Sequence, residues 1–169
     1  MKVSTIGFTK KSAQRFFELL RESGAARIVD VRLHTTSQLA GFAKKGDLAW
    51  LARELCGAEY VHEPCLAPTK ELLTGYRQGK IPWEEYEFRF INLMESRRVE
   101  SALSPEIVDN GCLLCSEDQP HHCHRRLVAE YLKKHWGGLE IEHLGLKKGA
   151  CRNENPVSNT VPTREGPRD

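Results

Sequence analysis

Long hydrophobic runs are absent from the sequence, because no stretch approaches the roughly 18 consecutive apolar residues typical of a membrane-spanning helix. The first residues lead directly into a strand-like pattern and lack the apolar segment of a secretory signal. We therefore expect a cytoplasmic protein without membrane association. In that compartment thiols stay reduced, so the six cysteines are expected to be buried, metal-bound or reactive.

An excess of charge of one sign is also lacking, since 25 Lys and Arg against 23 Asp and Glu give a formal net charge of +2. Such a balance does not by itself favour nucleic acid or an anionic membrane as a partner. Nucleic-acid binding would instead need a local basic patch. The lysines that would have to share one face are Lys10, Lys11, Lys44, Lys45, Lys147 and Lys148.

Several motifs of nucleotide and hydrolase chemistry are missing. The chain contains neither the glycine-rich loop of dinucleotide-binding folds nor that of P-loop proteins. The G-x-S-x-G elbow of serine hydrolases is absent as well. These absences disfavour dinucleotide-dependent redox chemistry, P-loop hydrolysis and a Ser-His-Asp mechanism.

What is present is an alternation of short apolar strands with amphipathic helices. Strands are predicted over residues 2–8, 27–31, 58–62, 111–116 and 139–144. Helices are predicted over residues 11–22, 47–57, 69–76, 82–94 and 123–136. This order predicts a three-layer α/β fold, Rossmann-like or flavodoxin-like, with a mostly parallel five-stranded sheet and helices on both faces. Residues 1–145 are expected to form a single domain, and 146–169 a flexible or disordered polar tail.

The predicted helices carry recognisable boundary residues. Thr9 or Ser12 can cap the first helix, and Asp47 can cap the second. Pro82 suits the first position of the helix that follows it. Trp83 and Tyr86 recur there at helical spacing and are interpreted as core residues.

Reactive side chains are concentrated in residues 115–126, between the fourth predicted strand and the helix after it. In a parallel sheet every strand-to-helix loop opens on the same edge, so the loops after strands one, two and four can converge. We therefore expect a polar, partly basic pocket at this edge.

Arg32 emerges from the second predicted strand into that pocket. A buried guanidinium needs a partner, so Arg32 either pairs with Asp30 or Glu117, or binds an anionic ligand. Asp30 suits a structural role, because a carboxylate at a strand end accepts hydrogen bonds from the adjacent loop.

Cys115 ends the fourth strand, where loop N–H groups and nearby basic residues would lower its pKa; the alternative is an inert buried thiol. Glu117 is either a general acid/base or a brace for an arginine. Cys123 and His124 flank the helix amino terminus, which attracts anions. His121 and His122 precede that helix and are expected to be exposed.

A metal site is the alternative interpretation of the same cluster. Cys115, Cys123 and His124 offer ligands that zinc accepts. The fourth ligand would be Glu117, His34 or His143. The seven residues between the two cysteines do not match common zinc spacings, which disfavours this interpretation.

With these motifs the chain resembles the bacterial and archaeal family called domain of unknown function 488, over about residues 1–145. The matching segments are 5–7, 30–32 with Ser37, Phe42 with Leu48, 60–62 with Leu66, 114–117 and 123–125. The resemblance implies a compact α/β domain whose activity is not established. It carries over Arg32, Cys115, Glu117, Cys123, His124 and Arg125 as motif residues. The chain departs from many relatives in having Phe8 in place of His, and Thr35 or Thr36 in place of Pro.

These observations predict an enzyme or enzyme-like domain that binds an anionic small molecule, a nucleotide or phosphorylated metabolite, at the carboxyl edge of the sheet. The expected catalytic residues are Cys115, Glu117 and His124, and the expected ligand-binding residues are Arg32, Ser37, Cys123 and Arg125. No particular cofactor is indicated. The alternatives are a non-catalytic metal- or nucleic-acid-binding module and a purely structural hydrogen-bond network.

Overall fold

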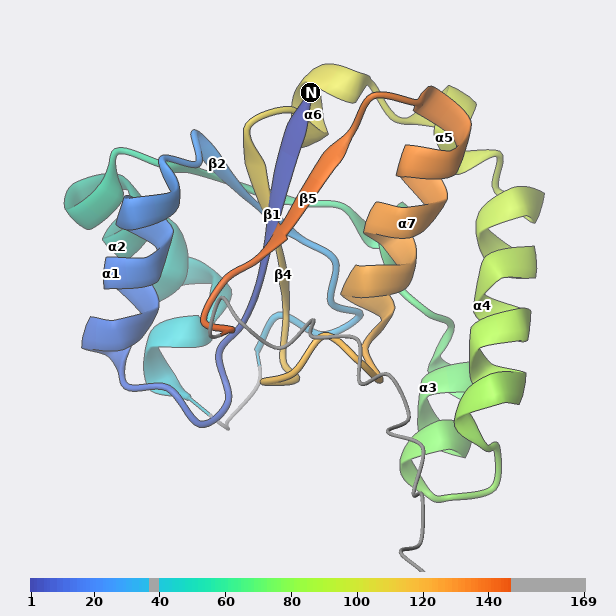
Figure 1. Cartoon of the computed structure of the whole chain (residues 1–169). Coiled ribbons are helices and arrows are strands. Elements are labelled where there is room, and N and C mark those ends of the chain that lie inside the picture. Colours follow the sequence, from blue (N-terminus) through green and yellow to red (C-terminus); the bar gives the residue numbers. More distant parts are fainter. Residues whose placement is uncertain (37–39, 147–169) are drawn as a thin grey trace, which may run out of the picture.

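The computed structural model of the chain describes residues 1–36 and 40–146 (Figure 1). Five parallel strands form one sheet with helices on both faces, which confirms the predicted three-layer α/β class. The strands are β1 Lys2–Gly7, β2 Arg27–Asp30, β3 Glu59–His62, β4 Gly111–Cys115 and β5 Glu140–His143. The predicted polar tail, apart from Leu146, lies outside the described residues.

The helices divide into two layers (Figure 1). One face of the sheet carries α1 Ala13–Ser23 and α2 Lys45–Cys56. The other layer contains α3 Lys70–Arg77, α4 Trp83–Ser96, α5 Val99–Ala102, α6 Pro105–Val108 and α7 His124–Trp136. Among the described residues, no helix combines the length and the hydropathy needed to span a membrane.

Both faces of the sheet are buried, as the continuous apolar runs in the strands require. Ile6, Ile28 and Leu114 pack against the layer of α1 and α2. Val29 and Leu113 belong to the cluster on the opposite face. Because neighbouring residues of a strand point to opposite faces, Leu113 and Leu114 each contribute to a different core.

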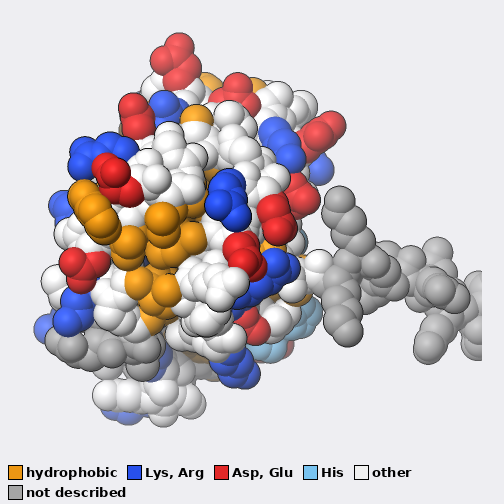
Figure 2. All heavy atoms as spheres, turned by 90° about the vertical axis from the view of Figure 1, so that its left-hand side faces the viewer, with side chains coloured by type: hydrophobic (Ala, Val, Ile, Leu, Met, Phe, Trp, Pro, Cys, Tyr) orange, Lys and Arg blue, Asp and Glu red, His pale blue; other side chains and the backbone are white. Residues whose placement is uncertain are grey.

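The outer surface on the side of α1 and α2 shows hydrophobic side chains gathered between charged ones (Figure 2). The large apolar side chains that α2 exposes are Trp50, at 57%, and Leu55, at 49%. This face lies on the other side of the sheet from α3, α4 and α7. Trp50 is therefore a convenient control for substitutions made in those helices.

The helix boundaries follow the predicted signals in part. Ser12 caps α1 by accepting a hydrogen bond from the Arg15 amide. The prediction that Asp47 caps α2 is wrong, because Lys44 is the N-cap residue. Asp47 lies instead in the first turn, where a carboxylate is favoured by the helix dipole. Pro82 is likewise the N-cap of α4 and not its first helical residue.

The strand order is β3-β2-β4-β1-β5, so β4 is inserted between β2 and β1. Rossmann-like and flavodoxin-like sheets have the orders 3-2-1-4-5 and 2-1-3-4-5. Here the connection through α1 skips one position, which β4 later occupies. The order confirms that the loops after the first, second and fourth strands lie side by side.

A crevice is expected between β2 and β4, because the chain leaves these neighbouring strands toward opposite layers. The connection after β2 leads to α2, whereas the connection after β4 leads to α7. At such a switch point the two loops separate, and ligands of α/β sheets bind there. This is the position of the Cys/His loop.

Candidate functional site

A cavity of about 470 Å³ lies at the carboxyl ends of β2 and β4. Residues from three parts of the chain line it: the segment after β2, helices α3 and α4, and the loop between β4 and α7. The lining residues are Arg32, Leu33, His34, Leu73, Tyr76, Arg77, Trp83, Tyr86, Cys115, Ser116, Glu117, His122, Cys123 and His124. The volume falls in the range of small-molecule sites, about 300–1,000 Å³.

Cys115 and His124 form a thiol–imidazole pair in the wall of this cavity. The Cys115 sulfur lies 3.7 Å from Nδ1 and 3.8 Å from Nε2 of His124. Nε2 also lies 2.8 Å from the Val31 carbonyl oxygen, which can only accept a hydrogen bond. Nε2 therefore carries a proton, and Nδ1 is the nitrogen available to the sulfur. The pair is thus oriented by a third group, the arrangement that activates nucleophiles.

The two buried cysteines have opposite tendencies to ionise. A hydrogen bond from Cys123 is the largest influence that lowers the pKa of the Cys115 thiol. The charge of Arg125 and the backbone N–H groups of Ser116 and Glu117 lower this pKa further, against the effect of burial. Burial raises the pKa of Cys123 well above its ordinary value. Of the two thiols, Cys115 is therefore the one that ionises more readily.

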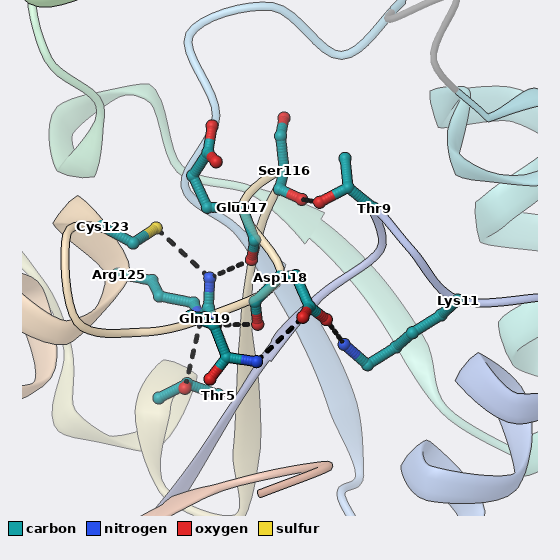
Figure 3. A network of polar contacts seen from close by, with 9 residues as sticks. All are labelled: Thr5, Thr9, Lys11, Ser116, Glu117, Asp118, Gln119, Cys123 and Arg125. Carbon is teal, nitrogen blue, oxygen red and sulfur yellow. Dashed lines mark hydrogen bonds and ion pairs between the residues drawn. The ribbon is translucent and has the colours of Figure 1, made fainter.

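Arg125 fixes the loop that carries these groups (Figure 3). Its side chain is 1% exposed and donates hydrogen bonds to the backbone carbonyls of Glu117 and Asp118. It also donates to the Thr5 hydroxyl and, over 3.3 Å, to the Cys123 sulfur. In the part of the chain that the structure describes, Arg125 is not among the residues that line the cavity. Arg125 therefore affects the site through the two thiols: it donates a hydrogen bond to Cys123, and its charge favours ionisation of Cys115.

The end of β1 supports the same loop from the other side (Figure 3). Gly7 packs so closely that a Cβ atom there would lie 1.6 Å from the Glu117 carbonyl oxygen. The Thr9 hydroxyl donates to the Ser116 carbonyl over 2.8 Å. Lys11 forms an ion pair with Asp118. Three successive residues of the loop, 116–118, are thereby held by close packing against Gly7 and by bonds to the segment that follows β1.

Arg32 combines a structural pair with a free donor. It is 3% exposed, and its Nε donates to Asp30 over 2.8 Å, which settles the open choice of structural partner in favour of Asp30 over Glu117. Tyr60 donates to the same carboxylate over 2.6 Å. Among the described residues, the buried Nη1 of Arg32 has no hydrogen-bond partner. A buried donor without a partner is rare and marks a position for a further acceptor.

The remaining predicted site residues are placed as follows. Glu117 is exposed and lines the cavity, and its backbone carbonyl, not its carboxylate, accepts the hydrogen bond from Arg125. Ser37 lies outside the described residues. His34 lines the cavity at an exposed position, and His122 is exposed as predicted. His143 hydrogen-bonds to Thr5 over 2.8 Å.

The candidate metal ligands come together in space despite their spacing in the sequence. Cys115, Cys123 and His124 are buried, and their ligand atoms all lie within 4.8 Å of one another. Glu117, His34 and His143 are not part of this group among the described residues. The turn between β4 and α7 folds the chain back, so that the sequence separation of the cysteines does not measure their distance.

The aromatic part of the cavity wall was not found from the sequence. Tyr86 is 2% exposed, as expected for a core residue, but Trp83 is only partly buried and both residues line the cavity. Leu73 and Tyr76 of α3 lie beside them. The available signal was topological: the connection that leaves β3 begins at the carboxyl edge, so its first helices must pass the site.

Fold and site define a parallel α/β domain with a buried Cys/His cluster at a switch point of the sheet. A model of the family "Domain of unknown function DUF488" matches residues 12–132, more than half of the chain. The protein belongs to this family, as the motifs of its sequence indicate. Comparison with curated proteins found no match, and neither did comparison with solved structures.

Proposed function

We propose that this protein is an enzyme that uses the Cys115 thiolate as a nucleophile on a small anionic substrate bound in the cavity. One observation carries the proposal. Cys115 lies 3.7 Å from His124 Nδ1, and the other nitrogen of that ring is held by the Val31 carbonyl oxygen. A nucleophile, a base and a group that orients the base thus lie together in the wall of a ligand-sized cavity.

The surroundings favour negative charge on the sulfur. Arg125 is almost fully buried, and the hydrogen bonds described above lead from it to neutral oxygen atoms and to Cys123. A buried cation is costly without a compensating anion, and a thiolate at Cys115 supplies one. In this proposal Arg125 is a positioning residue that holds the loop and favours the thiolate, rather than a direct ligand of the substrate.

The chemical step follows from these positions. His124 Nδ1 takes the proton of Cys115, and the sulfur lone pair forms a bond to an electrophilic carbon or phosphorus of the substrate. The leaving group departs with the electron pair of the broken bond and receives the proton from His124. Water, deprotonated by His124 or Glu117, then attacks the same atom, and the Cys115 thiolate leaves.

Arg32 supports the recognition of an anion. Asp30 neutralises its charge and fixes its plane, Nη1 has no hydrogen-bond partner among the described residues, and the residue lines the cavity. The amino terminus of α7 begins at His124 and adds a partial positive charge. An anionic group between these two features would satisfy the unpaired donor.

Alkylation with iodoacetamide, followed by mass spectrometry, tests the nucleophile. We expect Cys115 to react faster than Cys56 and Cys65, because burial raises the pKa of both of those thiols. His124→Gln should slow alkylation of Cys115, and Cys56→Ser serves as the matched control. Equal rates at all three cysteines, or an unchanged rate in His124→Gln, would contradict the proposal.

A metal centre is a second candidate, favoured by the ligand atoms of Cys115, Cys123 and His124 that lie within 4.8 Å of one another. The Val31 carbonyl beside Nε2 is the kind of outer partner that ligating histidines have. Three such ligands fit zinc with an open fourth position. Stoichiometric zinc in purified protein that is lost in Cys123→Ala would favour this candidate, and metal-free protein that takes up no added zinc would exclude it.

The nucleic-acid alternative has less support. Of the lysines that would have to share a face, Lys11 is engaged with Asp118. Lys147 and Lys148 lie outside the described residues. Phosphate contacts make binding strongly salt-dependent, so an interaction that is weak and insensitive to salt would count against this alternative.

A further inference from the structure

The cavity has an aromatic side that the chemistry at Cys115 does not require. Trp83 stacks on Tyr86 with a centroid separation of 5.3 Å and an interplanar angle of 23°. The ring centroid of Tyr76 lies 5.5 Å from that of Trp83 and 4.8 Å from that of Tyr86. Leu33 and Leu73 extend the same apolar side. Flat, partly buried rings that line a cavity favour a flat ring in the ligand.

Two charged side chains line the same cavity. Arg77 is exposed and lines the cavity, and it interacts electrostatically with Tyr86. The exposed Glu117 side chain lines the same cavity and interacts electrostatically with Tyr76. Neither side chain has a hydrogen bond or ion pair with another of the described residues. One donor and one acceptor are therefore free beside the aromatic side.

A third group of residues suits the anion. Arg32 contributes its unpaired donor, and the amino terminus of α7 contributes its partial positive charge, both beside Cys115. His122 is exposed and packs against Trp83, with a centroid separation of 5.0 Å and an interplanar angle of 33°. It therefore connects the aromatic side with the polar loop.

We infer that the substrate is a mononucleotide. Its base would pack on the aromatic side, with the ring edge at Arg77 and Glu117 and the phosphate near Arg32. A phosphorylated sugar would leave the aromatic side facing water, and a nucleic-acid strand would need a basic track that a net charge of +2 does not indicate. This inference deepens the proposed function and rests on it for the use of the cavity as a substrate site.

Binding of the four nucleoside monophosphates, ribose 5-phosphate and inorganic phosphate to the Cys115→Ser protein tests the inference, because this variant keeps the cavity without the nucleophile. We expect at least one nucleotide to bind about 10-fold or more tightly than ribose 5-phosphate. Loss of one stacking ring costs about 5- to 100-fold in affinity, so Trp83→Leu should weaken binding by that factor. Trp83→Phe should restore most of it, and Trp50→Leu, on the opposite layer, should change nothing.

Three results would overturn the inference. Nucleotides that bind no more tightly than ribose 5-phosphate would show that no base is recognised. Short single-stranded oligonucleotides that bind more tightly than mononucleotides would assign the cavity to the end of a strand. Protection of Cys115 in the wild-type protein from iodoacetamide by ribose 5-phosphate, without a preference for nucleotides, would remove this inference and leave the thiolate proposal intact.

Discussion

Cys115 depends on one neighbouring thiol for its charge. The hydrogen bond from Cys123 is the largest influence that lowers the pKa of Cys115, so Cys123→Ala should raise this pKa. Alkylation of Cys115 at pH 7 should then slow several-fold, since only the thiolate reacts. Cys123→Ser retains a donor and should keep most of the rate, which pH–rate profiles for iodoacetamide can show. Equal slowing in both variants would mean that the side chain at position 123 acts by packing alone.

Removal of the Asp30 charge should strongly destabilise the structure around Arg32. It is fully buried and binds both Arg32 and Tyr60, so Asp30→Asn leaves a buried guanidinium without its counter-ion. We expect a loss of about 3–5 kcal/mol in the free energy of unfolding, measured by urea denaturation. Glu59→Gln is the matched control, because its pair with Arg27 is 73% exposed on the glutamate side and such pairs contribute less than about 1 kcal/mol. Similar losses of unfolding free energy in the two variants would contradict the role of Asp30 as the buried counter-ion of Arg32.

At the level of elements, the approach of β1 to the β4–α7 loop requires glycine. Gly7→Ala would place a methyl group 1.6 Å from the Glu117 carbonyl oxygen, which forces the loop and Arg125 to move. We expect a loss of at least about 3 kcal/mol in the free energy of unfolding and slower alkylation of Cys115, since backbone overlap costs more than ordinary overpacking.

Gly46 of α2 provides the control for this prediction. A Cβ atom there meets no atom within 4 Å, so Gly46→Ala should be neutral or stabilising by up to about 1 kcal/mol. Thermal or urea denaturation of the two variants compares them directly. Equal stability of the Gly7 and Gly46 variants would show that the loop yields without cost.

The ends and lengths of the helices show which features a local sequence pattern can predict. Ser12, one of the two N-caps predicted for the first helix, caps α1, because a cap is a local hydrogen-bond requirement. The prediction for Asp47 is wrong because its carboxylate suits a first turn as well as a cap, and the N-cap lies three residues earlier, at Lys44. The short helices α5 and α6 were missed, since four residues are too few for a periodic signal.

Across the whole molecule, one hydrogen-bonded chain joins α7, β1 and β5. Arg125 donates to the Thr5 hydroxyl, which is hydrogen-bonded to Nδ1 of His143 over 2.8 Å. Burial lowers the pKa of His143 below its ordinary value of 6.5, and the charge of Arg125 adds to this. The folded state therefore favours the neutral imidazole, whereas the unfolded chain takes up a proton at about pH 6.5.

Stability should consequently depend on pH through His143. Its contribution is fully present above about pH 6.5 and is lost as the pH falls through the lowered pKa, because the unfolded state binds the extra proton first. We expect His143→Gln to lose less stability than the wild type between pH 7.5 and pH 5, measured by urea denaturation. His34→Gln, at an exposed position, should follow the wild-type profile. A His143→Gln profile parallel to that of the wild type would contradict this account.

Local sequence patterns predict the α/β class, the buried apolar strands, and the residues that reach the carboxyl edge, including Arg32, Cys115 and His124. These follow from local periodicity and from the rule that parallel strands end at one edge. The three-dimensional arrangement is needed to show that Arg32 pairs with Asp30, that Arg125 braces the loop, and that Trp83 and Tyr86 line the cavity. The reason is physical: hydrogen bonds and cavities join residues far apart in sequence, and their partners are set by strand order, which no local pattern encodes.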